Sequence, residues 1–362
     1  MNAEITGWGK CLPPTVLTNT DLEKIVETSD DWITTRSGIK ERRISHVETS
    51  DMATVAGLRA LAAAGREPEE VDLVILATCS PDSMIPSAAS HVQRKLGAIR
   101  AGAFDLNAAC SGWLYGLVVG SDMVRSGLHR RVLLIGSEKL HYYTNFSDRS
   151  TAVLFADGAG AALLEPTDEP VGMLAAELGS DGEAAQYLCI PDRGTLGHPR
   201  AGIPSEQAIY MDGREVFRRA VATMGDASVR VVEQAGWSLG EVDMLIPHQA
   251  NVRIIDATTR RLGLDPSKAF VNIGSYGNTS AATIPIALTE ALEQRVIEPQ
   301  SKLVFAAFGA GLSWAAVAWR WGSRVDPIGE SDAELPPTTE TVWELLQGNF
   351  DFYGTQLPGE QS

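Results

Sequence analysis

Cysteine is scarce in this chain. Only four of its 362 residues are cysteines, and they lie far apart, at Cys11, Cys79, Cys110 and Cys189. No Cys-x-x-Cys pair occurs, which argues against a disulfide framework or a structural metal site and favours a reducing compartment. We therefore expect a cytoplasmic protein without a bound metal.

Basic residues are also in short supply. The chain has 30 Lys and Arg residues against 46 Asp and Glu residues, a formal net charge of −16. General binding to nucleic acid needs a basic surface, so this composition argues against a nucleic-acid partner.

Long apolar runs are missing too. The uncharged segment Leu303–Trp319 is interrupted by glycines and is shorter than the ~20 apolar residues that a membrane span needs. We interpret it as two buried strands joined by a glycine turn, and we expect no membrane span. The first residues show no basic region followed by an apolar stretch, so no secretory signal is expected.

The chain resembles itself at a fixed offset. The segment Ala64–Leu76 is similar to Ala235–Pro247, and 235 − 64 = 171. The segment Arg131–Glu138 aligns with Lys302–Gly309, and 302 − 131 = 171 again. Two separated matches at one offset indicate two similar halves.

Short apolar runs alternate with helical stretches in both halves. Strands are predicted at 71–77, 132–135, 242–246 and 303–307, and helices at 52–64, 87–96, 110–126, 216–235 and 252–262. Apolar runs of this length are typical of buried, mostly parallel strands, and their alternation with helices indicates an α/β protein. We therefore predict an N-terminal half, 1–168, and a C-terminal half, 169–322.

The pattern stops after Trp321. Residues 326–337 are mostly polar and end in two prolines, and a short amphipathic helix is predicted at 339–346. We predict that 323–362 form an arm that docks on the body or on a second subunit. A disordered tail is the alternative.

Cys110 lies where a turn of small and polar residues leads into an apolar helix. The segment reads Asn107-Ala-Ala-Cys110-Ser-Gly-Trp-Leu-Tyr-Gly. At a helix N-terminus, the dipole and the unpaired N–H groups favour the thiolate, which is the nucleophilic form. We therefore predict a lowered pKa and a nucleophilic role, with inert packing as the alternative.

Two further residues follow predicted strand ends. His248 occurs in Pro247-His248-Gln-Ala-Asn251, and Asn278 occurs in a glycine turn that leads into an apolar helix. Open α/β sheets place their sites at strand ends, so we expect both residues near Cys110. Each alone has a structural explanation, as a packed imidazole or as a turn residue.

The order Cys–His–Asn also occurs in papain-like cysteine proteases. Their Cys-Gly-[Ser/Ala]-Cys-[Trp/Tyr] signature is missing here, and an internal repeat has no place in that fold. The protease interpretation is therefore disfavoured.

Taken together, these motifs resemble beta-ketoacyl-acyl-carrier-protein synthase III. The similar segments are Asp31–Arg42, Asn107–Gly112, Asp157–Ala161, Pro247–Asn251, Gly277–Ala281 and Phe308–Gly311. The resemblance runs from the N-terminus to about Trp321. It implies a thiolase-like α/β fold, in which two pseudo-symmetric βαβαβ-type halves form a layered αβαβα core, with the arm appended. It also implies a homodimer.

The resemblance implies a decarboxylating Claisen condensation that needs no cofactor. An acyl-CoA starter acylates Cys110, and malonyl-acyl carrier protein is then decarboxylated. The carbanion attacks the acyl-enzyme and gives a 3-oxoacyl-acyl carrier protein, which initiates fatty acid synthesis. His248 and Asn278 are expected to donate hydrogen bonds to the malonyl thioester oxygen, where each contributes ~3 kcal/mol. The N–H of Ala310 is expected in the oxyanion hole, and Phe308 is expected to support the donor pair.

Binding residues follow by the same resemblance. Trp32 is expected to stack on the CoA adenine, and Arg36 and Arg149 to contact the base or the phosphates. The pantetheine channel is expected to be lined by Gly213, Phe217, Ala250 and Asn251.

Acyl carrier protein is acidic, as this chain is, so docking requires a local basic patch. Helical stretches supply candidates for that patch at Arg218, Arg253, Arg260 and Arg261. An ordinary solvated face is the alternative.

One position departs from the family pattern. Ile85 stands where a gate residue, often Phe, is expected to reach the partner subunit's acyl pocket. A smaller side chain leaves room for a longer or branched starter.

Three rivals remain. A synthase III relative of a secondary-metabolite pathway is the nearest alternative. A biosynthetic thiolase is disfavoured because no second cysteine lies in a glycine turn near the C-terminal strands. A non-catalytic subunit is disfavoured by the presence of Cys110, His248 and Asn278.

Overall fold

Two β-sheets form the framework of the protein, in a computed structural model that describes residues 1–191, 194–195 and 208–355. The first sheet has the order β1-β7-β6-β4-β5. Its strands are β1 (Asn2–Cys11), β4 (Leu73–Ala77), β5 (Gly102–Leu106), β6 (Val132–Lys139) and β7 (Asp157–Thr167). β4 runs parallel to β5 and β6, whereas β7 runs antiparallel to β6 and β1.

The second sheet has the order β11-β12-β13-β8. Its strands are β8 (Gly172–Ser180), β11 (Met244–Pro247), β12 (Lys302–Gly309) and β13 (Ser313–Arg320). β11 and β12 are parallel, and the other pairs are antiparallel. The predicted pair of strands in the uncharged segment 303–319 is confirmed, because β12 and β13 pair across the glycine turn.

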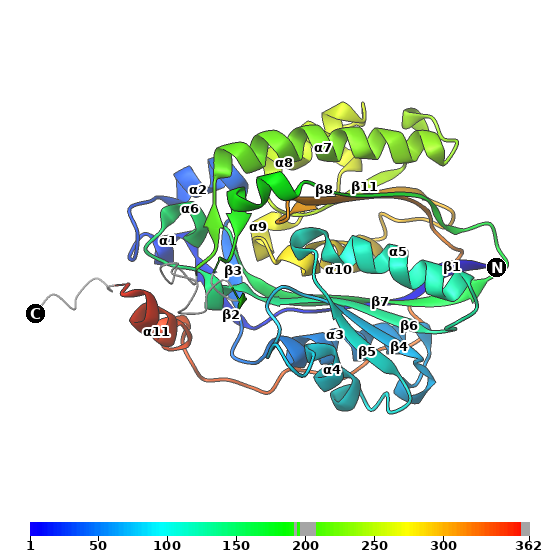
Figure 1. Ribbon diagram of the computed structural model, residues 1–362, viewed down its shortest axis with the longest axis horizontal. Helices are drawn as coiled ribbons and strands as arrows, with labels where there is room; N and C mark the ends of the chain where they lie inside the picture. Colours follow the sequence, from blue (N-terminus) through cyan, green and yellow to red (C-terminus); the bar gives the residue numbers. More distant parts are fainter. Residues whose placement is uncertain (192–193, 196–207, 356–362) are drawn as a thin grey trace, which may run out of the picture.

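Helices separate and cover the sheets in five layers (Figure 1). The outer helices are α3 (Thr49–Ala64) and α4 (Ala88–Leu96) on the first sheet, and α7 (Gly213–Gln234) and α8 (Val252–Arg261) on the second. α5 (Gly112–Arg125) and α10 (Thr283–Glu293) lie between the sheets. The predicted layered α/β fold is confirmed.

Short elements complete the body. They are β2 (Thr15–Thr18), α1 (Asn19–Leu22), α2 (Asp30–Ser37), β3 (Glu41–Ile44), α6 (Arg149–Ala152), β9 (Leu188–Cys189), β10 (Tyr210–Met211) and α9 (Ile273–Tyr276).

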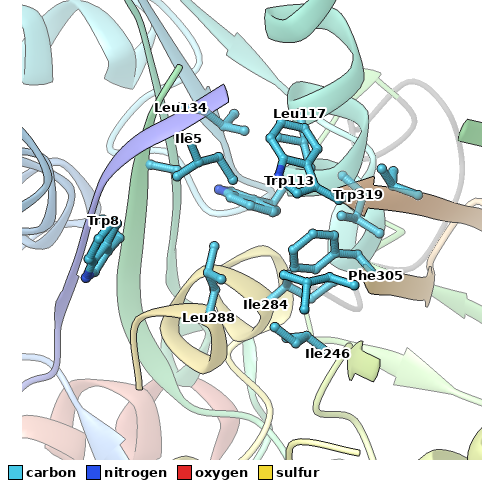
Figure 2. Close-up of a cluster of buried hydrophobic side chains, with 14 of the residues drawn as sticks. Ile5, Trp8, Trp113, Leu117, Leu134, Ile246, Ile284, Leu288, Phe305 and Trp319 are labelled. Carbon is cyan, nitrogen blue, oxygen red and sulfur yellow. The ribbon is translucent and has the colours of Figure 1, made fainter. Parts of the chain in front are cut away.

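The core between the sheets explains why α5 and α10 are apolar on nearly every side. Figure 2 shows Trp113 of α5 and Ile284 of α10 between side chains from both sheets. The ring of Trp113 meets Phe305 of β12 edge-on, with centroids 6.2 Å apart. Each such buried side chain contributes about 1.5–3 kcal/mol. This packing holds the first residues of α5 and α10 close together, beside the strand ends.

The offset found in the sequence recurs in the fold. α5 begins at Gly112 and α10 at Thr283, and 283 − 112 = 171. Each helix follows a 3₁₀ turn, and 280 − 109 = 171 for their first residues. Ala109 and Ser280, at those equivalent positions, both have positive φ, 46° and 49°. The turn that carries Cys110 and the turn that precedes α10 therefore occupy equivalent positions in the two halves, and they contact each other.

The arm lies on the body of the same chain. Ile328 N donates to Ala63 O at 2.9 Å beside α3, and His46 Nε2 lies 2.7 Å from Pro336 O. The chain then enters α11 (Val342–Tyr353), which begins later and runs longer than the predicted helix at 339–346. The Thr341–Glu344 capping box explains this start, since it satisfies the first free N–H groups.

Candidate active site

One cavity brings the three predicted catalytic side chains together. Cys110, His248 and Asn278 all line it, and its volume is about 160 Å³. The same cavity is lined by Gly213, Phe217, Ala250, Asn251 and Phe308. Residues from both halves of the chain therefore face one space, as the proposed joint chemistry requires.

Cys110 sits in the 3₁₀ turn that precedes α5, not within the helix itself, which begins at Gly112. Gly309, the last residue of β12, packs directly against it. A Cβ atom on Gly309 would lie 2.8 Å from Cys110 N and 2.8 Å from Cys110 Cβ. Only glycine fits between the strand end and the nucleophile, because any side chain would displace one of them.

The predicted lowering of the Cys110 pKa is wrong. Burial raises the pKa of this thiol to about 12, with a hydrogen bond to Ser280 acting in the opposite direction and the nearby Glu138 adding to the rise. Desolvation of the charged form is the largest cause of this rise, because the sulfur is buried. The site without substrate therefore holds a neutral thiol, which must lose its proton as it attacks.

His248 is placed by the end of β11. Its N–H donates to Ala306 O of the neighbouring strand at 2.8 Å. Its Nδ1 lies 2.6 Å from Thr283 Oγ1, and Nε2 is buried without a partner. Burial lowers the pKa of His248 to about 3, so the imidazole is neutral, and its ring lines the cavity.

Asn278 is fixed by three hydrogen bonds. Its backbone N–H donates to Leu154 O at 2.9 Å, and its carbonyl accepts from Ala156 N at 3.0 Å. Its side-chain Oδ1 accepts from Ser280 N at 2.8 Å. With Oδ1 engaged, the Nδ2 amide remains to donate into the cavity.

Sequence reasoning missed Thr283, Ser280 and Gly309. Thr283 binds the His248 ring, and Ser280 bonds both the Cys110 thiol and the Asn278 amide. The repeat offered a signal for Ser280, which lies 171 residues after Ala109, beside Cys110. Nothing in local sequence pointed to Thr283, since a threonine at a helix start is usually only a cap.

The mouth of the cavity continues toward α2. Asn251 caps α8 by accepting from Arg253 N, and its Nδ2 donates to Arg36 O at 3.0 Å. Trp32 lies on the same helix as Arg36. The guanidinium carbons of Arg36 and Arg149 lie 5.1 and 4.7 Å from the centre of the Trp32 ring. The predicted adenine-side residues thus form one cluster beyond the mouth.

The predicted docking arginines differ in their surroundings. Arg218 is paired with Glu215 at 2.6 Å and Arg261 with Asp226 at 2.9 Å. Arg253 lies over the ring of Phe217 at 5.2 Å, and Arg260 is exposed at the end of the same helix, α8. Arg253 therefore lies against a side chain that lines the cavity.

Other predicted positions have the following surroundings. Ala310 comes directly after Gly309, and its carbonyl accepts from Ser313 Oγ at 2.8 Å. Ile85 is 90% exposed in the single chain.

The described ranges contain no group of three or more His, Cys, Asp or Glu side chains placed to bind a metal ion. In the same ranges, every helix is too short or too polar to cross a membrane.

Comparison with known proteins agrees with this geometry. Residues 104–182 match the family profile described as 3-oxoacyl-[acyl-carrier-protein] synthase III, and residues 232–321 match the profile of its C terminal part. A beta-ketoacyl-[acyl-carrier-protein] synthase III 2 of Vibrio cholerae is 52% identical over 344 residues, 95% of each chain. The chain belongs to the beta-ketoacyl-[acyl-carrier-protein] synthase III family.

This synthase III is accordingly a condensing acyltransferase, and its fold is shared with solved members. The crystal structure of 3-oxoacyl-[acyl-carrier-protein] synthase III from Aquifex aeolicus is 45% identical, with a TM-score of 0.83, and covers 88% of this chain and 100% of that one.

The matches to the relatives of this synthase III differ in length. The relative from Symbiobacterium thermophilum is 49% identical over 322 residues, 88% of this chain and 98% of its own. The Vibrio cholerae match is longer, at 344 residues. Only 322 residues precede the extension, and 344 − 322 = 22, so this match includes at least 22 residues of the extension.

Proposed function

We propose that this synthase III joins an acyl-CoA starter to malonyl-acyl carrier protein, with Cys110 as the nucleophile. The observation that carries this proposal is the single cavity lined by Cys110, His248 and Asn278. A thiol, an imidazole and an amide are the groups that acyl transfer and enolate stabilisation require. The cluster of Trp32, Arg36 and Arg149 beyond the mouth suits an adenine nucleotide.

In the first half-reaction, the Cys110 sulfur attacks the thioester carbonyl of the acyl-CoA. The Cys110 thiol is neutral, with a pKa near 12, and His248 is too weak a base to hold its proton, since burial lowers the pKa of that imidazole to about 3. The thiol proton leaves as the sulfur attacks and ends on the departing CoA sulfur, while the acyl group stays on Cys110. The backbone N–H groups of Cys110 and Ala310 donate hydrogen bonds to the oxyanion that forms during this attack.

In the second half-reaction, malonyl thioester loses carbon dioxide and negative charge grows on its thioester oxygen. Asn278 Nδ2 and His248 Nε2–H donate to that oxygen. For Nε2 to carry the proton, Nδ1 must be bare, and the Thr283 hydroxyl then turns from Ser280 O, to which it donates at 3.0 Å, and donates to Nδ1 instead. The carbanion then attacks the acyl-enzyme, forms the carbon–carbon bond and releases the Cys110 thiolate.

Substrates and assembly follow the same proposal. Acyl carrier protein docks at the mouth near Arg253, and no cofactor is used. Two copies form a homodimer, in which the exposed Ile85 of one copy closes the acyl pocket of its partner. A condensing role in a secondary-metabolite pathway is the alternative, and product analysis with malonyl-acyl carrier protein against malonyl-CoA separates the two.

Intact mass after incubation with a panel of acyl-CoAs tests the proposal. The natural sequence gains one acyl mass, and Cys110→Ala gains none but keeps part of its malonyl decarboxylation. His248→Ala and Asn278→Ala lose decarboxylation by about 100-fold each, since each donor contributes ~3 kcal/mol. Equal acylation of Cys110→Ala and the natural sequence would refute the assignment.

A further inference from the structure

The C-terminal extension takes no part in the chemistry at Cys110, yet α11 is packed into the body by apolar side chains. Leu346 and Phe350 are both fully buried, at 0% and 1% exposure. The ring of Phe350 meets Phe146 edge-on, with centroids 5.7 Å apart. A contact of this kind is worth more than the burial of area alone. Phe146 lies three residues before Arg149, the first residue of α6.

Polar contacts join α11 and the residues after it to the same segment. Asn349 Nδ2 donates to His141 O at 2.8 Å. Ser147 Oγ donates to Thr355 Oγ1 at 3.0 Å, only two residues before Arg149. The segment from His141 to Ser147, which leads into α6, is therefore held by the extension at both ends.

The cluster around α11 also contains the wall of the expected adenine site. Phe146, Ala152 of α6 and Ile33 of α2 belong to the same buried cluster as Phe350, and Trp32 packs against it. Two turns earlier on the same face of α11, Trp343 packs against this cluster, and Lys24 lies over its ring at 5.4 Å from the centre. α11 thus packs into the cluster that residues of α2 and α6 also join, and it contacts the segment that leads into α6.

Those elements cannot keep their shape alone. α1 and α6 are four residues long and α2 is eight, all below the ~12 residues at which an isolated helix becomes even marginally stable. These helices are stabilised by packing against their neighbours, and the buried side chains of Phe350 and Leu346 are part of the cluster against which they pack. Figure 1 shows α11 at the end of the molecule where α1 and α6 lie, far from the N-terminus.

We propose that the C-terminal extension is a brace for the adenine-side wall of the acyl-CoA site, with Phe350 as its positioning residue. The inference rests on the proposed function, because it takes acyl-CoA as the ligand of Trp32, Arg36 and Arg149. The brace acts on binding of the nucleotide end and leaves the reacting atoms untouched. It therefore lowers KM for acyl-CoA without changing kcat.

Two alanine variants of the full chain separate this role from general stability. Phe350→Ala removes the ring packed on Phe146, whereas Phe352→Ala removes a ring of the same helix that is 58% exposed. For each protein we would measure the Kd of CoA by calorimetry. We would also measure KM and kcat with acyl-CoA and with the acyl thioester of N-acetylcysteamine, which lacks the nucleotide.

Phe350→Ala should weaken CoA binding and raise KM for acyl-CoA about 10-fold, equivalent to about 1.4 kcal/mol, with kcat unchanged. The N-acetylcysteamine thioester should react as it does with the natural sequence, and Phe352→Ala should match the natural sequence throughout. If Phe350→Ala does not fold, Phe350→Leu is measured in the same way.

Equal loss with both thioesters, or equal behaviour of the two alanine variants, would overturn the brace. Failure of the natural sequence to bind CoA would overturn the proposed substrate, and this inference with it. Binding of CoA with equal affinity by all three proteins would overturn the brace alone.

Discussion

The contact between Gly309 and Cys110 gives the sharpest test of how the nucleophile is held. In Gly309→Ala the new Cβ would lie 2.8 Å from Cys110 N and 3.2 Å from Cys110 Cα, whereas ordinary contact begins at 3.4 Å. The shortfall against the N atom is 3.4 − 2.8 = 0.6 Å. The atoms in the way are backbone or Cβ atoms, which cannot rotate aside. The turn that carries Cys110, or the end of β12, must therefore move.

This movement affects both the stability of the protein and the rate of acylation, and the size of each effect can be estimated. Overpacking of this kind costs about 1–3 kcal/mol of stability. A displacement of ~1 Å at a reacting group lowers the rate about 100-fold, so a shift of 0.6 Å should slow acylation on the order of 10- to 100-fold. The rate of acyl-enzyme formation, followed by intact mass under single-turnover conditions, measures this directly. Thermal unfolding measures the loss of stability separately.

Gly120 supplies a matched control. A Cβ there would also meet an atom at 2.8 Å, but that atom is Cδ1 at the end of the flexible Leu164 side chain, deeper along α5. Gly120→Ala should therefore lose stability while its acylation rate stays within a few-fold of the natural sequence. Acylation of Gly309→Ala at the natural rate would refute the idea that glycine is needed to place the thiol. Equal slowing in Gly120→Ala would do the same.

Two further predictions concern charge. Since burial raises the pKa of Cys110 to about 12, its alkylation by iodoacetamide should accelerate about 10-fold per pH unit between pH 7 and 9, without a plateau. A plateau below pH 8, measured by peptide mass at Cys110, would show that the thiolate is stabilised after all. Arg253→Glu should raise KM for malonyl-acyl carrier protein about 10-fold and leave acylation by acyl-CoA unchanged, and the difference should shrink in high salt. Equal loss in both half-reactions would contradict a docking role for Arg253.

The sequence alone determined the element types and the repeat, because both are written in local patterns. Apolar runs of strand length and helical spacing do not depend on what surrounds them, so β4, β11, β12 and the helices α3, α4, α5, α7 and α8 were predicted to within a few residues. Motifs around Cys110, His248 and Asn278 identified the family. The predicted division into two halves at residue 168 stays a prediction.

The tertiary structure decided the electrostatics and the contacts between distant residues. The helix start next to Cys110 suggested a thiolate, but burial beside Glu138 raises the thiol pKa, and burial is a property of the folded surroundings. Thr283 meets the His248 ring, and Gly309 meets Cys110, across 35 residues and 199 residues of chain. Such partners are set by how the two halves pack, because no local pattern records which side chain will stand opposite another once the sheets close on α5 and α10.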